Sequence, residues 1–394
     1  MLTLRLTLGA PPLAQLLRLL LVFASAGVGL LLLTALSRAV EHPARPAGAL
    51  PGLLWCLIPL AVTAHLAAAL AEAEPGAPLR SGLDAAGLGP VRLPLLVART
   101  AAIPCAVGGG LALLITVRGQ GGADDGAPVV RLPGAAVELP LAQEALPLPA
   151  ALTLLTAVPL LAALAAARAA RTGTAATGAT PCGQAPNRRR LTGTAALTAG
   201  LVLAAAGLLL AAYAVRHTPE TARTGTPRPA ELASSPLAAG WLLTALGLVL
   251  AGPALTSLAG RLLTAGRPGA VRLLAGRALA RESALAGRPL AALGVVGAAA
   301  LVAVRARLAE TELPAPGPAG TLAAALVACC VGGVTLAAMA RARHSRAPLA
   351  VLLERLGASR GTRRAVAAVR VAVVAAVFAT PMLVAGLLAP LPTR

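Results

Sequence analysis

Residues 16–36 read LLRLLLVFASAGVGLLLLTAL, a run of 21 residues in which Arg18 is the only charged side chain. A helix of this length rises about 30 Å, which is the thickness of the hydrocarbon core of a bilayer. The run is too long and too continuously apolar to be one face of a soluble helix. It predicts an uncleaved membrane-spanning helix near the start of the chain.

Eight further apolar runs follow, separated by stretches rich in Arg, Pro and Gly. Hydrophobic residues make up 57% of the 394 residues and charged residues 12%, against about 25% charged residues in soluble domains. This composition excludes a soluble enzyme and predicts an all-α, polytopic membrane protein with about nine transmembrane helices. The predicted spans are 16–36, 53–70, 95–117, 148–167, 191–215, 237–258, 290–304, 321–340 and 365–388.

The charge of the chain is strongly positive, at +20, and every basic residue is Arg. Aromatic residues, which would stack on bases, make up only 1%, so we expect no nucleic acid partner. With the N-terminus inside, 24 of the 34 Arg fall on the inner side and nine of the 14 acidic residues on the outer side. The positive-inside rule therefore predicts a cytoplasmic N-terminus and a basic surface that faces anionic lipids.

Three loops between the predicted spans have recognisable patterns. Residues 128–139 favour a small hairpin, although prolines weaken the strands. Residues 172–190 are rich in Thr, Gly and Ala and predict a flexible linker. Residues 271–282 predict a surface helix leading into the seventh span, on which Arg272, Arg281 and Glu282 face away from the leucines.

A weak internal repeat relates two cytoplasmic segments at an offset of 270 residues. Residues 83–90 read LDAAGLGP and residues 353–360 read LERLGASR, and both begin Leu-acid-x-x-Gly. Each segment follows a span that enters the cytoplasm and leads into the next span. We interpret this as a parallel repeat of a span, a short outer loop, a span, a cytoplasmic helix and a further span.

The second copy resembles a known family. LERLGASR at 353–360, followed by Arg363 and Arg364, resembles the L-x-x-L-G-A-S-R-R-x-x-R-R segment of FtsX-like permeases of ABC transporters, which include MacB-like exporters. VRLLAGRAL at 271–279 resembles the basic lead-in to the second unit of two-unit members from high-GC bacteria. The resemblance implies two related FtsX-like units joined by a two-helix linker, with the second unit lacking its last span.

The same resemblance implies a division of the chain and a set of site residues. The first unit, with four spans, covers 1–170, the linker covers 171–262, and the second unit, with three spans, covers 263–394. In the family the segment is a cytoplasmic coupling helix that abuts the ATPase, and Gly357 suits its C-cap. The expected ATPase-coupling residues are Asp84, Gly87, Arg92, Glu354, Arg355, Gly357, Ser359 and Arg360.

Catalytic chemistry of its own is not expected in this chain. Without any Lys it cannot carry an ordinary Walker A motif, so an ATPase must be a separate chain. The sequence shows no H-E-x-x-H motif and no Cys or His set at metal-ligand spacing, so we expect no catalytic, cofactor or metal site. His65, the one His inside a predicted span, is either a functional group or a neutral side chain bonded to a neighbouring helix.

The expected function is the permease subunit of an ABC transporter in the bacterial plasma membrane. Its expected partners are an ABC ATPase, the lipid bilayer, and a second permease chain or a second copy. One alternative is a non-transporting scaffold or regulatory subunit, favoured by the missing last span and by Thr100 and Arg370 where the family often has Glu. An ion-coupled secondary transporter is a third hypothesis, disfavoured by the scarcity of intramembrane acids.

Overall fold

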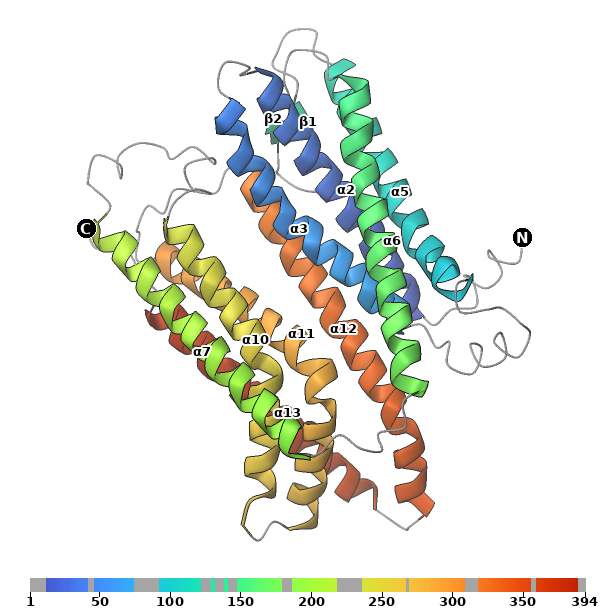
Figure 1. Ribbon diagram of the computed structural model, residues 1–394, viewed down its shortest axis with the longest axis vertical. Helices are drawn as coiled ribbons and strands as arrows, with labels where there is room; N and C mark the ends of the chain where they lie inside the picture. The colour runs from blue at the N-terminus through green and yellow to red at the C-terminus, as the bar shows by residue number, and fades with distance from the viewer. Residues whose placement is uncertain are drawn as a thin grey trace. The chain divides into compact units, whose positions relative to one another are not determined.

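The computed structural model is helical throughout the residues it describes, apart from one short hairpin (Figure 1). The described residues are 12–41, 46–73, 92–121, 129–131, 138–140, 147–178, 186–217, 236–266, 269–308, 318–355 and 359–388. The helices are α2 (Pro12–Glu41), α3 (Pro46–Ala73), α5 (Arg92–Gly121), α6 (Leu148–Gly178), α7 (Pro186–His217), α10 (Pro236–Thr264), α11 (Ala270–Leu308), α12 (Pro318–Arg355) and α13 (Arg360–Leu388).

Eight of these helices are long and apolar enough to cross a membrane. They coincide with the first eight predicted spans, and the chain is therefore a polytopic α-helical membrane protein. The ninth predicted span, 365–388, is helical within α13 but is not among these eight. Its crossing of the membrane stays a prediction.

The chain divides into two compact units. The first comprises Met1–Thr180, Arg228–Ala233 and Ala315–Ala337, and the second comprises the remaining segments of the chain. The long helix α12 contributes its first half to the first unit and its second half to the second unit. The predicted division into 1–170, 171–262 and 263–394 concerns sequence-related units rather than contact clusters, and it stays a prediction.

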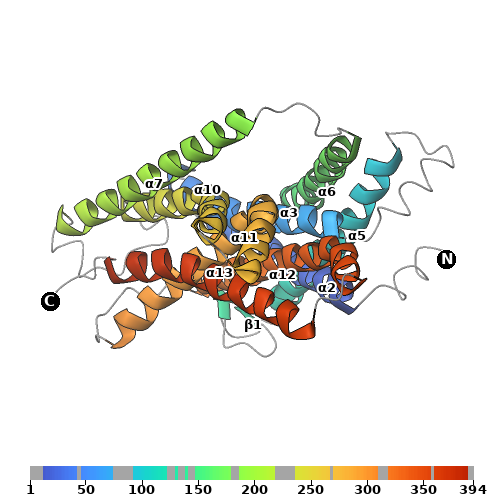
Figure 2. The ribbon, with the colours of Figure 1, turned by 90° about the horizontal axis from the view of Figure 1, so that it is seen from below.

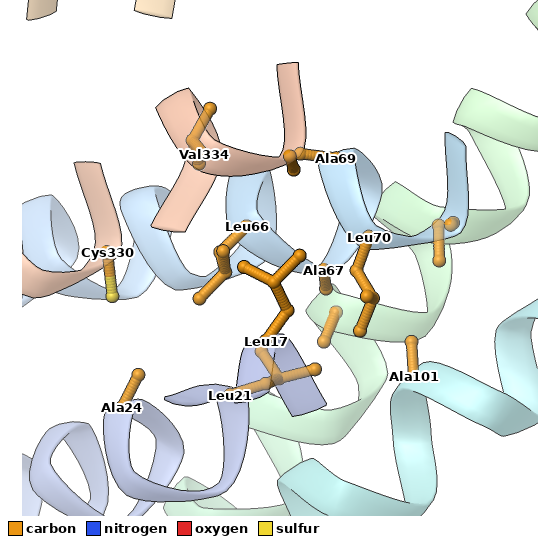
Figure 3. Packing of buried hydrophobic residues seen from close by; sticks show 14 of the residues in the cluster. Leu17, Leu21, Ala24, Leu66, Ala67, Ala69, Leu70, Ala101, Cys330 and Val334 are labelled. Carbon is orange, nitrogen blue, oxygen red and sulfur yellow. The ribbon is translucent and has the colours of Figure 1, made fainter. Parts of the chain in front are cut away.

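In the first unit, α2 is the central helix. It packs against α3, α5 and α6, while α6 also packs against α3 and α5 (Figure 1). The core cluster in Figure 3 joins Leu17 and Leu21 of α2 to Leu66 and Leu70 of α3 and to Cys330 of α12. Without water in the hydrocarbon region, buried hydroxyls need partners within the protein. Ser25 accordingly donates a hydrogen bond to the Val22 carbonyl at 2.9 Å.

The second unit is built on helix pairs with very close backbones. Figures 1 and 2 both show α10 between α7 and α11. A Cβ atom on Gly207 of α7 would lie 2.5 Å from the Thr244 nitrogen of α10, and one on Gly247 would lie 2.5 Å from the Ala204 nitrogen of α7. This small-residue interface allows the two antiparallel helices to approach without intervening side chains.

The spacing of the small residues explains the α7–α10 interface. They recur at alternating intervals of four and three residues, which keeps one seam of each helix toward its partner. On α7 they are Gly200, Ala204, Gly207 and Ala211, and on α10 they are Gly240, Thr244, Gly247 and Ala251. The buried Thr244 hydroxyl donates to the Gly240 carbonyl at 2.8 Å and lies 3.4 Å from the Ala204 carbonyl.

The structure confirms one of the three loop predictions and corrects two. Strand β1 (Val129–Arg131) pairs antiparallel with β2 (Glu138–Pro140), as the hairpin prediction required. The predicted linker at 172–190 is wrong at both ends, because α6 continues to Gly178 and α7 begins at Pro186. Ala-rich and Arg-rich sequence sustains a helix well beyond the apolar run that defines a span.

Candidate coupling site at the ends of α12 and α13

The segment that resembles the coupling motif lies where α12 ends and α13 begins. α12 is one continuous helix of 38 residues that ends at Arg355, although its candidate span ends at His344. Its last eleven residues therefore extend about 16 Å beyond the span. The expectation of a separate short coupling helix is wrong for the described residues, since Glu354 and Arg355 form the last turn of α12 itself.

Ser359 caps the start of α13. Its side-chain oxygen accepts a hydrogen bond from the Thr362 backbone nitrogen at 3.2 Å and lies 2.9 Å from the Thr362 hydroxyl. A serine that accepts from the amide three residues later is a standard N-cap, and it satisfies one of the amides that the first turn leaves without a partner. Ser359 is therefore the N-cap residue of α13.

Arginines outnumber acidic residues at the two helix ends, where Glu354 is the one acid. The last turn of α12 carries the exposed Arg355, and a cation suits the negative end of a helix dipole. The first turn of α13 has no acidic residue and begins with Arg360, with Arg363 and Arg364 close behind. Cations at the positive end of a dipole are unfavourable, so this end of α13 is suited to an acidic surface.

The first copy of the motif is described only at its end. Asp84 and Gly87 lie outside the described residues, as does Gly357 of the second copy. Arg92 is the first residue of α5, and Arg360 is the first residue of α13. Each copy thus leads into a helix that begins with an arginine.

An ion pair ties α13 to α11 within the second unit. The Arg370 guanidinium donates a hydrogen bond to a carboxylate oxygen of Glu282, 88 residues earlier in the chain. The two side chains are only 12% and 11% exposed. Burial removes both charges from water, and their mutual attraction and hydrogen bonding offset part of that desolvation.

This pair corrects the sequence prediction for residues 271–282. Arg272 and Arg281 are exposed as expected, but Glu282 is buried. The predicted surface helix is the first part of α11, which runs without interruption from Ala270 to Leu308. Because α13 packs along this helix, the face that carries Glu282 is covered.

A sequence signal for this pair existed. Glu282 is the only acid among the arginines of 261–288, and Arg370 is a charged residue inside the predicted span 365–388. A charge in such a position predicts a partner. The sequence did not show which residue that partner is, since the two lie on helices that are distant along the chain.

In both units, the first helix of the repeat packs against the third, α2 against α5 and α11 against α13. In the first unit, a Cβ on Gly108 of α5 would meet Val22, Ser25 and Ala26 of α2, with the Val22 carbonyl oxygen 2.5 Å away. In the second unit, a Cβ on Gly294 of α11 would lie 3.7 Å from the carbonyl oxygen of Phe378 in α13. The offset of 270 relates the helices but not the contacting residues, because Gly294 corresponds to Ala24, whereas Gly108 meets Val22, Ser25 and Ala26.

This correspondence is independent of the motif that suggested the repeat. Along the sequence, the first Leu-acid-x-x-Gly copy lies between α3 and α5, and the second lies at the junction of α12 and α13. The two crossings differ in their chemistry, because the glycine sits on α5 in the first unit and on α11 in the second. The position that corresponds to Arg370 at the offset of 270 is Thr100 in the first unit.

Other chemistry-bearing residues do not assemble into a site in the described part of the chain. Among those residues, no group of three or more His, Cys, Asp or Glu could hold a metal ion. His65 is exposed on the surface of the first unit and has an interaction of its own. Cys56, Cys105 and Cys330 are free and buried inside apolar helices, where cysteine packs as a small hydrophobe.

Comparison with known protein families, curated proteins and solved structures finds no match for this chain.

Proposed function

We propose that this chain is the permease subunit of an ABC transporter of the FtsX-like type. The observation that carries the proposal is the equivalent packing of the first and third helices of each repeat, α2 with α5 and α11 with α13, beside motif copies at an offset of 270 residues. In this proposal the chain has two related membrane units. In each unit a cytoplasmic segment precedes the last helix of the repeat, and two such segments suit coupling to a pair of ATPase domains.

The mechanical part of the proposal rests on the helices around the break. A push on the exposed end of α12 and the capped start of α13 acts on two long helices rather than on a loop. α13 passes the movement to α11 through their packed faces and through the pair of Arg370 and Glu282. Packed helices move as rigid bodies, so displacement at one end reaches the membrane-spanning part.

The partner in this proposal is a separate ATPase chain with an acidic docking surface. The chain has no Lys for a Walker A motif, so the nucleotide site must lie elsewhere. Arg355, Arg360 and Arg364 would meet carboxylates on that surface, which would also offset the unfavourable dipole of α13. The proposed setting is a bacterial plasma membrane with the N-terminus and this break on the cytoplasmic side.

The first test is purification of the tagged chain in mild detergent, with identification of co-purifying chains and an assay of ATP hydrolysis. We expect a stoichiometric ABC ATPase with vanadate-sensitive turnover. Recovery without an ATPase, repeated in native membranes after crosslinking, would overturn the permease proposal. Binding of an ATPase that is neither stimulated nor coupled to transport would support the scaffold alternative instead.

The second test places the docking surface. Arg355→Ala should lower ATPase binding or stimulation several-fold, because it removes a charge at the proposed contact. Arg343→Ala is the matched control, since Arg343 is an exposed arginine on the same helix, three turns earlier. Equal effects of the two substitutions would mean that the end of α12 is not the docking surface, whether or not an ATPase binds.

A further inference from the structure

A groove in the first unit has a charge at one end and is otherwise apolar. It has a volume of about 420 Å³ and lies between α3 and α6, with four lining residues from each helix. Seven of these eight residues are Leu or Ala, and the eighth is Arg168. The volume falls within the range of small-molecule binding sites, about 300–1,000 Å³.

Small side chains create the groove. Ala61 and Ala64 on α3 and Ala165 on α6 lie where larger residues would fill the space between the helices. Leu57 and Leu161 line the groove and are themselves 51% and 41% exposed. Both helices are candidate spans, so these exposed leucines face hydrocarbon. An acyl chain is therefore the natural occupant of the apolar part.

Arg168 places a positive charge at the level of lipid headgroups. It is the fourth residue from the end of the candidate span Leu148–Arg171, within reach of the membrane surface for a side chain that snorkels. Arg171 lies one turn further on the same face, and both residues are exposed. Guanidinium groups bind phosphate oxygens in a bidentate way, and basic pockets between transmembrane helices bind anionic headgroups.

We propose that the groove between α3 and α6 binds an anionic phospholipid of the surrounding bilayer, with an acyl chain against Leu57 and Leu161 and the headgroup phosphate at Arg168. A zwitterionic lipid presents the same chain and phosphate but no net charge, so the arginines select the anionic lipid. The site belongs to the first unit alone. It does not depend on an ATPase partner or on the proposed transport function.

The test uses tryptophan fluorescence and brominated lipids, which quench only when they contact the indole. Trp55 and Trp241 are replaced by Phe, and Leu161→Trp places one reporter in the groove. The full chain is reconstituted in phosphatidylcholine vesicles that contain increasing fractions of brominated phosphatidylglycerol. Ile103→Trp is the matched control reporter, because Ile103 is 64% exposed on α5 and does not line the groove.

We expect the groove reporter to reach half-maximal quenching at a phosphatidylglycerol fraction about fivefold lower than the control reporter does. One arginine near an anionic membrane surface contributes about this factor to the affinity for the lipid. Arg168→Gln should remove the difference between the two reporters, and Arg168→Lys should retain part of it. Equal lipid preference at both positions, or a preference that Arg168→Gln leaves unchanged, would overturn the proposal.

A second measurement avoids the reporter substitution, which could disturb packing. Native mass spectrometry of the unsubstituted chain, released from vesicles with equal amounts of phosphatidylglycerol and phosphatidylcholine, counts the lipids retained. We expect one retained phosphatidylglycerol that Arg168→Gln removes. Retention of phosphatidylcholine in equal amount, or no change on substitution, would show a non-selective lipid contact.

Discussion

Removing one partner of the Glu282–Arg370 pair should destabilise the second unit much more than removing both. Arg370→Met takes away the cation but keeps much of the side-chain volume, and it leaves Glu282 covered by α13 without its counter-charge. Breaking a buried ion pair in this way costs about 3–5 kcal/mol. Because each side chain keeps about a tenth of its surface exposed, we expect the lower end of that range, about 3 kcal/mol.

The double variant Glu282→Gln with Arg370→Met removes both charges. Replacing a buried pair with uncharged residues is often neutral, so this variant should lie within about 1 kcal/mol of the unsubstituted chain. Together with Glu282→Gln alone, these two variants form a double-mutant cycle with a coupling energy of about 2 kcal/mol or more, as is found for contacting groups. The charge reversal, Glu282→Arg with Arg370→Glu, should recover part of the stability that either single reversal loses.

The assay is unfolding in mixed detergent micelles by titration with sodium dodecyl sulfate, followed by circular dichroism. Arg272→Met and Arg364→Met are the controls, because each removes an exposed arginine from the same two helices. They should change the free energy of unfolding by less than about 0.5 kcal/mol. A coupling energy below about 0.5 kcal/mol for the pair would refute the argument that α13 is held to α11 by charge.

Three further predictions follow from individual contacts. Gly207→Ala should destabilise the chain by about 1–3 kcal/mol in the same assay, because its Cβ meets the backbone of α10. The control Gly110→Ala should be neutral or stabilising, because there is open space around Gly110. Equal effects of the two substitutions would contradict the α7–α10 interface. Gly108→Ala should be destabilising even when combined with Ser25→Ala, since the Val22 carbonyl still lies 2.5 Å from the new Cβ, and rescue by the second substitution would contradict that geometry. Ser359→Ala should reduce stability by about 1 kcal/mol through loss of the N-cap while Ser359→Asp should retain it, and hydrogen exchange at the Thr362 amide should rise only in the alanine variant.

Much of the architecture could be predicted from the sequence because the membrane imposes a local rule. A run such as 16–36 needs only enough apolar length to cross the bilayer, and that length is visible without any knowledge of its neighbours. Eight predicted spans were confirmed in this way. Helix ends were less predictable, since α11 and α12 continue through arginines that mark the membrane boundary but do not break a helix.

The assignment of 353–360 as a coupling site stays a prediction, and the helical structure there differs from the expected short helix. Resemblance to a permease motif pointed to residues 353–360. In the structure α12 ends at Arg355, and Ser359 caps the start of α13. What the sequence missed was the tie between α13 and α11. Glu282 and Arg370 are 88 residues apart, and their pairing depends on which helices pack together rather than on any local pattern.

By itself, the sequence determined the class of the protein and eight of its spans, because burial in lipid depends on composition and length. Only the tertiary structure decided which helices meet. In apolar spans such as those of α7 and α10, hydrophobic periodicity does not mark the covered face. The periodic small residues mark a face but do not say which helix it will meet. Gly207 packs against Thr244 because the two helix backbones approach closely, and Glu282 pairs with Arg370 because both charges are buried. Neither close approach nor burial exists until two distant segments are in contact.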